Sequence, residues 1–586
     1  MKLSGDAFTL KTLEQYGYHF GVGNNIINEN NLITLTKELL SDNKDAVIEY
    51  LNLQKDLANK YKKNYNNEET IEKCEQVITI AEMLGDFKIE TEYMVIKGSV
   101  LQLTGKFDEA QNVFKKSLRK AENNNDLSNM GKSYSALGRV REDKGDYELA
   151  ISFQEKAIHL FEKIQDKTGL ASSIGSLGDI YYEKGDYNKA MNFYSKQLLI
   201  NKEAGNKKGI HIAVESMGDV LKEQGDYNHA LKYLGKSLKI LEEFDDKIGI
   251  SMTIGNMGNV YYDKGDLANA IKCYEKQLMI CESLGYKKGI SAALGNLGTI
   301  FIEKNDFKQA LKYLGRSLKI LEELGDKAGI TMVVGNIGNL YVNKGKLEKA
   351  MIYYEKQLKI CKELGHKRGI AIALGNIGIV HTELGSYEQA LEYLKNSLEI
   401  LNELGSKRII SINLGNVGNV HKEKNEYDKA IKCYDEAILI CNEIGASYNL
   451  IHILIEKAEV LFLQKKYRQA NKLISEVIKK PVDKGSNDNI FKANLLLHKT
   501  EYFIESKEKS IVQLQKLFNT TNEEKDIADL HYELYQLLTI NEDNIVDKNQ
   551  LDEHRKESLK MYKKIYRITK AFKYKKRIGG LTSKKD

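Results

Sequence analysis

The chain has 586 residues, of which 42% are hydrophobic and 29% are charged, and its formal net charge is +6. This composition is ordinary for a soluble protein, and no apolar run reaches the roughly 18 residues that a transmembrane helix needs. The first residues, MKLSGDAFTLK, lack the apolar segment of a signal peptide. Pro481 is the single proline and tryptophan is absent, so the composition favours an all-α fold.

Residues 1–45 carry the weakest helical pattern. Asp6 is expected to cap a helix that extends to about Tyr18, and a second short helix is expected over residues 32–40, after a polar loop. The segment is either a degenerate repeat or a helical N-terminal cap.

Residues 46–480 repeat a unit of 40 residues, of which residues 326–365, DKAGITMVVGNIGNLYVNKGKLEKAMIYYEKQLKICKELG, are one copy. One column of small residues contains Thr70, Ala110, Ala150, Ala190, Ala230, Ala270, Ala310, Ala350, Ala390, Ala430 and Ala470. A second column contains Ala58, Gly98, Gly138, Gly178, Gly218, Gly258, Gly298, Gly338, Gly378, Gly418 and Ala458. Small side chains at fixed points let paired helices approach closely, and self-similarity at this period is typical of a solenoid. The columns predict about eleven units.

Each unit is expected to form two helices, which we call helix A and helix B. In residues 206–245, Asn206 is the expected N-cap of helix A, which extends to about Glu223. Gly225 and Asp226 then form the turn to helix B. In other units the expected N-caps are Asp126, Asp166, Asp246, Asp326 and Ser406.

The spacing of the tetratricopeptide repeat (TPR) consensus is matched by Leu177, Gly178, Tyr181, Ala190 and Tyr194. Over residues 46–480 the unit resembles the longer TPR variant of Leu-Gly-Asn-type spindle adaptors and kinesin light chains. Two features depart from the consensus: aliphatic residues stand where Trp is usual, and no proline ends helix B. The resemblance implies an all-α, right-handed α-solenoid of about eleven TPR hairpins with helical N- and C-terminal caps, in which helix A lines a concave groove.

Helix B alternates between two forms along the array. The form YEKQL occupies residues 274–278 and 354–358, whereas YLGKSL and YLGRSL occupy residues 233–238 and 313–318. We therefore expect a pair of units, 80 residues long, to be the segment that multiplied. The alternative is chance alternation.

Five of the six cysteines recur at two positions of helix B. The six are Cys74, Cys273, Cys281, Cys361, Cys433 and Cys441. Their recurrence indicates core packing rather than a disulfide framework or a metal site, and reduced thiols indicate a cytoplasmic protein.

No motif in the chain indicates catalysis or a cofactor. Residues 230–237, ALKYLGKS, fit a permissive phosphate-loop pattern, but they lie inside helix B, whereas that chemistry needs a flexible loop between a strand and a helix. The eleven histidines form no HExxH motif and no triad-like grouping. We therefore expect a protein that is not an enzyme and that binds no cofactor or metal.

Three polar columns of helix A form the candidate binding site. They contain Asn256, Asn296, Asn336, Asn376 and Asn416; Asn259, Asn339 and Asn419; and Asp263, Glu303, Asn343, Glu383 and Glu423. Their offsets put the three columns on one helical stripe, and asparagine offers a peptide backbone both a donor and an acceptor. The resemblance implies that this stripe lines the groove. The alternative is a solvated face copied by duplication, although asparagine is a poor mid-helix residue.

After Pro481 the repeat register is lost. Helices are expected over residues 491–506, 507–518, 527–538 and 554–576, as a C-terminal region that caps the last repeat. Residues 555–586 contain 13 Lys or Arg and two acidic residues. We expect a capping helix with a solvated basic face; contact with nucleic acid or an acidic membrane is the less favoured interpretation.

These patterns predict a non-catalytic scaffold or adaptor that binds protein or peptide ligands, extended or basic, in the groove. The alternative is a regulatory region of a larger ATPase, kinase or cyclase signalling protein, which the YKKRI sequence near the C-terminus resembles. We expect no nucleic-acid partner for the array. The acidic stripe and the basic tail together predict an intramolecular contact in which the tail occupies the groove.

Overall fold

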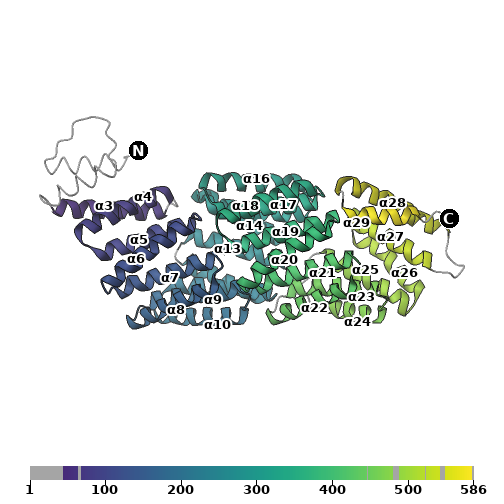
Figure 1. The fold of residues 1–586 in the computed structure, drawn as a ribbon, viewed down its shortest axis with the longest axis horizontal. Helices are drawn as coiled ribbons and strands as arrows, with labels where there is room; N and C mark the ends of the chain where they lie inside the picture. Colours follow the sequence, from purple (N-terminus) through teal and green to yellow (C-terminus); the bar gives the residue numbers. More distant parts are fainter. Residues whose placement is uncertain are drawn as a thin grey trace, which may run out of the picture. The chain divides into compact units, whose positions relative to one another are not determined.

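The structure, a computed structural model, describes residues 44–63, 67–243, 245–444, 447–479, 487–521, 523–540, 548–569 and 571–583. These residues form α-helices and one short 3-10 helix, without a β-strand (Figure 1). Among them, no helix has both the length and the apolar character needed to cross a membrane. The chain divides into two compact units, residues 1–173 and 174–586. The helices expected before residue 41, and Pro481, lie outside the described residues.

The first unit contains α3 (Lys44–Lys63), α4 (Asn67–Leu84), α5 (Phe87–Leu103), α6 (Phe107–Asn123), α7 (Leu127–Asp143) and α8 (Tyr147–Lys163), and the boundary falls inside α9 (Lys167–Glu183). The second unit continues with α10 (Tyr187–Glu203), α11 (Lys207–Glu223), α12 (Tyr227–Glu242), α13 (Lys247–Asp263), α14 (Leu267–Leu284), α15 (Lys287–Glu303), α16 (Phe307–Leu324), α17 (Lys327–Asn343) and α18 (Leu347–Glu363). It then has α19 (Lys367–Leu384), α20 (Tyr387–Leu404), α21 (Lys407–Glu423), α22 (Tyr427–Ile444), α23 (Ser447–Leu463) and α24 (Tyr467–Lys479). The C-terminal region contains α25 (Asn487–Ile504), α26 (Lys507–Lys516), the 3-10 helix η1 (Leu517–Thr520), α27 (Glu524–Ile540), α28 (Lys548–Thr569) and α29 (Phe572–Ser583).

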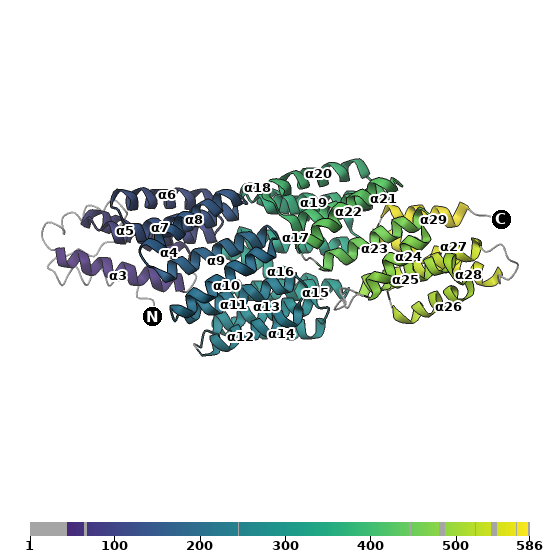
Figure 2. The same ribbon diagram turned by 90° about the horizontal axis from the view of Figure 1, so that it is seen from below.

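Successive helices pair into antiparallel hairpins that stack along each unit (Figures 1 and 2). Within the described residues, α3 to α24 make eleven hairpins in chain order, the number that the two small-residue columns predicted. Within each unit a hairpin contacts the next through neighbouring helices, as in α18 with α19. The chain is therefore an all-α solenoid.

The helix ends are set by the polar and glycine residues that the sequence indicated. The carboxylate of Asp326 accepts a hydrogen bond of 2.8 Å from the backbone N–H of Gly329, and Asn206 accepts one of 3.1 Å from Gly209. Equivalent bonds cap the helices after Asp126, Asp166 and Asp246. Ser406 differs, because its buried side chain makes no such bond.

The glycine column lies where helix A meets helix B of the same hairpin. A Cβ atom on Gly298 would lie 2.7 Å from Cγ of Leu314, and one on Gly338 would overlap the ring of Tyr354. The alanine column is buried as well, as Ala310 illustrates. Large side chains of helix B therefore fill the space that the glycines leave, which gives each hairpin a close-packed core.

The cysteines contribute to the same cores. Cys74, Cys281, Cys361 and Cys441 are buried, and all six are free thiols. Burial raises the pKa of the Cys361 thiol to about 11, so the thiol stays protonated and packs as a small apolar group.

The C-terminal region differs from the prediction in one place. The single helix expected over residues 554–576 is two helices, because α28 ends at Thr569 and α29 begins at Phe572. The break lets Tyr574 and Leu581 of α29 pack with Tyr562 of α28 in one buried cluster. This tertiary packing outweighs the continuous helical pattern of the sequence.

Hairpins five or six repeats apart also touch within the second unit. Nε of Arg408 in α21 lies 3.3 Å from Oε2 of Glu223 in α11. The backbone N–H of Lys407 donates to the carbonyl of Lys184 at 3.3 Å. Tyr194 and Tyr434 belong to one buried cluster. Sequence periodicity did not predict these long-range contacts.

Candidate functional site

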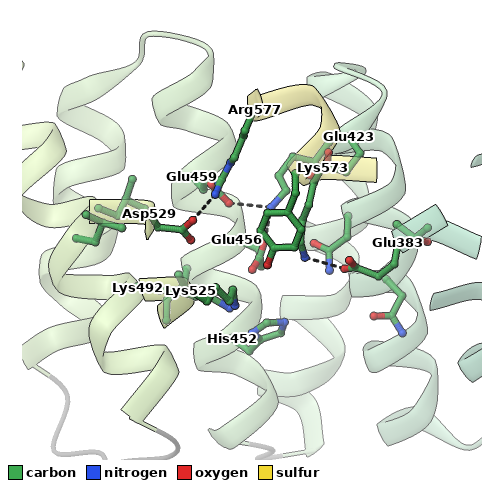
Figure 3. A pocket seen from close by; sticks show the side chains of 18 of the residues that line it. Glu383, Glu423, His452, Glu456, Glu459, Lys492, Lys525, Asp529, Lys573 and Arg577 are labelled. Carbon is green, nitrogen blue, oxygen red and sulfur yellow. Dashed lines mark hydrogen bonds and ion pairs between the residues drawn. The ribbon is translucent and has the colours of Figure 1, made fainter. Parts of the chain in front are cut away.

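The polar stripe of helix A borders a cavity of about 330 Å³ in the C-terminal part of the second unit (Figure 3). Helices α19, α20, α21, α23, α25, α27 and α29 contribute to its wall. Four predicted site residues line it, namely Glu383, Asn416, Asn419 and Glu423. Its charged lining residues are the acidic Glu383, Glu423, Glu456, Glu459, Asp529 and Glu533 and the basic Lys422, Lys492, Lys499, Lys525, Lys573 and Arg577. The cavity is therefore highly charged but carries both signs.

One ion-pair network joins α21 to α23 inside this cavity. Nζ of Lys422 lies 2.5 Å from a carboxylate oxygen of Glu456 and 2.7 Å from one of Glu459. Burial opposes the ionisation of both partners, but the attraction between them outweighs it, which raises the pKa of Lys422 and lowers the pKa of Glu456. All three groups are charged at neutral pH, so the network retains a net charge of −1.

Helix α29 forms one wall of the cavity. Arg577 pairs with Asp529 of α27 and donates a hydrogen bond of 2.8 Å to the hydroxyl of Tyr562. Lys573 extends in another direction and donates a hydrogen bond of 2.9 Å to Glu383 of α19. Figure 3 shows both side chains reaching from α29 toward these carboxylates.

Two predicted residues in the cavity are available to a ligand. Within the described part of the chain, the side chains of Asn416 and Glu423 form no hydrogen bond or ion pair. Both lie on α21, two helical turns apart, on the stripe that the sequence indicated. An amide and a free carboxylate so placed can bind a peptide group and a cation.

The first asparagine column mainly joins neighbouring hairpins. Asn256 donates a hydrogen bond of 2.9 Å to Glu215, and Asn336 donates one of 3.3 Å to Thr299. Asn296 donates to Asn259 at 3.4 Å. Asn376 is half-buried. These contacts run along the stripe from one helix A to the previous one, a role that the sequence did not indicate.

The second column has an internal partner. The amide oxygens of Asn259, Asn339 and Asn419 accept hydrogen bonds from the hydroxyls of Tyr274, Tyr354 and Tyr434, at 2.7, 2.6 and 2.7 Å. Each tyrosine belongs to helix B of the same hairpin. The column therefore supports the hairpin core, although Asn419 also lines the cavity.

The third column is more varied. Asp263 lies 3.9 Å from Lys222, Glu303 accepts a hydrogen bond from Tyr262, and Asn343 is exposed. Of this column, the structure places only Glu383 and Glu423 at the cavity. Of the thirteen predicted residues, four line this cavity.

Sequence reasoning missed the other walls of the cavity. Glu456 and Glu459 follow Asn416 and Asn419 by one repeat, so the columns could have been extended to them. No repeat signal marks the contributions of α25, α27 and α29, which lie outside the register. Among the described residues, no group of three His, Cys, Asp or Glu side chains could hold a metal ion.

Comparisons with known proteins identify the repeat. A family model described as tetratricopeptide repeat matches residues 129–198, 249–323 and 329–403, and a second model of the same description matches residues 413–443. No curated protein matches the sequence. A crystal structure of "Rap Protein Complexed with Competence and Sporulation Factor" is 17% identical, with a TM-score of 0.44, over 61% of this chain and 98% of that one. The crystal structure of BtubC from P. vanneervenii is 20% identical, with a TM-score of 0.32, over 36% of this chain and 88% of that one.

Proposed function

Because this chain is a tetratricopeptide repeat protein, we propose that it is a non-catalytic scaffold that binds a segment of a partner protein at the cavity between α19, α21 and the C-terminal helices. Repeat arrays of this kind serve as extended surfaces for protein interaction. The observation that carries the proposal is that Asn416 and Glu423 lie on the cavity wall without a hydrogen bond or ion pair to another described residue.

The chemistry of these two groups favours a peptide with a basic side chain. The Asn416 amide can both donate to and accept from a peptide backbone. The Glu423 carboxylate accepts hydrogen bonds only, and the neighbouring Lys422 is already paired with two other carboxylates, Glu456 and Glu459. A lysine or arginine of the partner would supply a cation to the Glu423 carboxylate, and a charge-assisted bond of this type is among the stronger polar contacts.

The proposal is tested with the full chain and a random peptide library displayed on phage. Selected peptides are synthesised with a fluorescent label, and their Kd values are measured by fluorescence polarisation. We expect Asn416→Ala and Glu423→Gln each to weaken binding by about tenfold, since each removes one hydrogen-bonding group.

Asn343→Ala is the matched control, because Asn343 belongs to the same stripe but is exposed and lies away from the cavity. Selected peptides should also be enriched in Lys or Arg, and their affinity should fall as salt rises. Failure to select any peptide, or selected peptides whose Kd is unchanged by both cavity variants, would refute the proposed site.

A further inference from the structure

Helix α29 makes two kinds of contact, and they separate along its length. Tyr574 and Leu581 are buried with Tyr562, and Arg577 pairs with Asp529. These contacts hold α29 to α27 and α28. Lys573, in contrast, reaches across the cavity to Glu383 of α19, which precedes it by 190 residues. The Lys573–Glu383 pair is thus separate from the contacts that anchor α29.

The carboxylate that Lys573 reaches belongs to the predicted binding stripe. Glu383 and Glu423 occupy the same position in successive repeats, and both line the cavity. Burial and the nearby charges of Glu423 and Glu383 raise the pKa of Tyr387 to about 12, which places both carboxylates around one tyrosine. Glu423 forms no ion pair within the described residues, whereas Glu383 is paired with a lysine of the chain itself.

The Lys573–Glu383 ion pair forms at neutral pH but is weak enough for another cation to replace Lys573. Burial disfavours the charge of Lys573, but the attraction of Glu383 outweighs this and raises the pKa of the ammonium group, so the pair is ionised at neutral pH. The two side chains remain 36% and 29% exposed. An ion pair with this exposure changes the equilibrium constant between the paired and unpaired states by up to about fivefold. A competing cation at Glu383 can offset a difference of this size.

We propose that α29 is an intramolecular ligand of the cavity, in which Lys573 takes the place at Glu383 that a basic side chain of the partner segment occupies when it binds. This inference rests on the proposed function and adds both the chemistry and the regulation of the ligand. A segment with two basic side chains would bind Glu423 and displace Lys573 from Glu383. Binding would leave α29 anchored through Tyr574, Arg577 and Leu581.

The test uses the full chain and a labelled synthetic peptide with the sequence of residues 571–583, AFKYKKRIGGLTS. Because this peptide carries the lysine equivalent to Lys573, it should compete for Glu383. We expect Lys573→Ala to tighten binding of the peptide by up to about fivefold at low salt. The gain should shrink as salt rises, since partly exposed charges are screened.

Lys575→Ala is the matched control, because Lys575 is an exposed lysine of the same helix and leaves the Lys573–Glu383 pair intact. Adding Glu383→Gln to Lys573→Ala should abolish the gain, and circular dichroism should show unchanged helix content in each variant. If the peptide binds no variant, or binds the Lys573→Ala and Lys575→Ala proteins equally, the inference is wrong.

The proposed function can be refuted independently of this inference. If library-selected peptides still depend on Asn416 and Glu423 while Lys573→Ala changes no Kd, the cavity binds peptides and α29 is only a structural wall. If the selected peptides do not bind at all, both the function and the inference are refuted.

Discussion

The hydroxyl of Tyr354 donates a hydrogen bond of 2.6 Å to the amide oxygen of Asn339. The same bond joins Tyr274 to Asn259 at 2.7 Å, 80 residues earlier. In the intervening repeat Leu314 fills the equivalent space, and Thr299 stands opposite in place of the asparagine. The alternation seen in helix B therefore continues into helix A, and it reflects two versions of one hairpin core.

Replacing Tyr354 with Phe should destabilise the array by roughly 0.5–1.5 kcal/mol, because a partly buried hydrogen bond is lost and the ring is kept. Replacing Tyr354 with Leu should cost more, since the smaller side chain leaves a cavity. The midpoint of urea unfolding gives both values.

The double variant Tyr354→Leu with Asn339→Thr copies the core of the preceding repeat. We expect it to be more stable than the sum of the single variants predicts, because the two positions are coupled. Strict additivity would show that the alternation has no energetic basis.

Gly338→Val should be far more damaging than Asn336→Ala. The valine would overlap the ring of Tyr354, which is itself buried, and such overpacking costs roughly 1–3 kcal/mol or more. Asn336 loses one hydrogen bond of 3.3 Å to Thr299 on a half-buried face. Equal shifts in the thermal unfolding midpoint would contradict this account of the glycine column.

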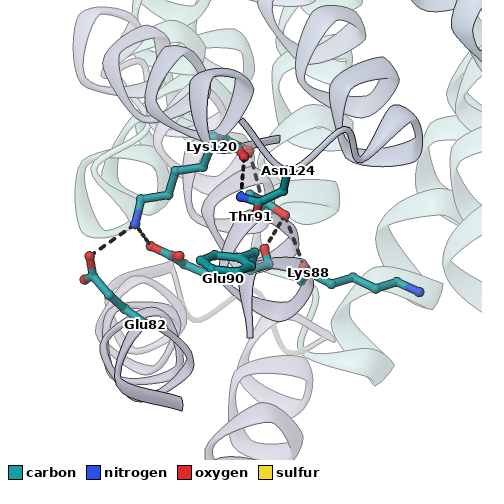
Figure 4. Close-up of polar contacts among 8 residues, drawn as sticks. Glu82, Lys88, Glu90, Thr91, Lys120 and Asn124 are labelled. Atoms are coloured by element: carbon teal, nitrogen blue, oxygen red, sulfur yellow. Dashed lines mark hydrogen bonds and ion pairs between the residues drawn. The ribbon is translucent and has the colours of Figure 1, made fainter. Parts of the chain in front are cut away.

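A buried ion pair in the first unit should be sensitive to the loss of one partner (Figure 4). Glu90 is 1% exposed and pairs with Lys120, which also lies 3.1 Å from Glu82. Lys120→Met should destabilise this unit by of the order of 3 kcal/mol, because it leaves a buried carboxylate without its cation.

Lys144→Met is the control for that variant. Lys144 pairs with Asp108, whose side chain is 89% exposed, so its loss should cost less than about 1 kcal/mol. Adding Glu90→Gln to Lys120→Met should recover part of the loss. Hydrogen exchange of α5 and α6 measures the effect within the unit, and similar exchange rates for the two lysine variants would argue against a buried pair.

Glu215 should make stability depend on pH. Burial, helped by the charge of Asp219, raises the pKa of this carboxyl to about 7, above its usual value of 4.5, against the hydrogen bonds from Asn256 and Thr253. Because the pKa of Glu215 is higher in the folded state than in the unfolded state, its contribution to stability is fully present below the unfolded pKa. That contribution is lost as the pH rises through about 7. Glu215→Gln should therefore stabilise the second unit at about pH 8, by of the order of 2 kcal/mol, and have little effect near pH 4.

Glu223, two turns further along α11, should behave in the opposite way. Burial opposes its ionisation, but Arg408 and Lys222 outweigh it and lower the pKa of Glu223. Its contribution is therefore present above the unfolded pKa and is lost as pH falls. Glu223→Gln should destabilise the protein at about pH 8. Unfolding midpoints of both variants across the pH range check the two signs, and a gain from Glu223→Gln would show that the Arg408 contact is not favourable.

The sequence predicted what each repeat determines by itself. The caps at Asn206 and Asp326 and the close approach at Gly338 follow from local rules of helix geometry, and the structure confirms them. The asparagine columns were placed on one stripe, but periodicity cannot reveal that Asn339 accepts from Tyr354 or that Asn256 donates to Glu215. The contact between Arg408 and Glu223 depends on a small rotation accumulated over five hairpins, and the cavity depends on helices outside the repeat. Neither property is encoded within a single unit.

The buried cluster that joins Tyr194 to Tyr434 sets an order for folding during synthesis. Each hairpin can form as soon as its own 40 residues have left the ribosome, but Tyr434 follows Tyr194 by 240 residues. At about 5–20 residues per second, the apolar faces of α10 and α11 wait roughly 10–50 s for α21 and α22. Completion of the second unit is therefore a late, long-range step, and the nascent chain is most exposed to aggregation in that interval.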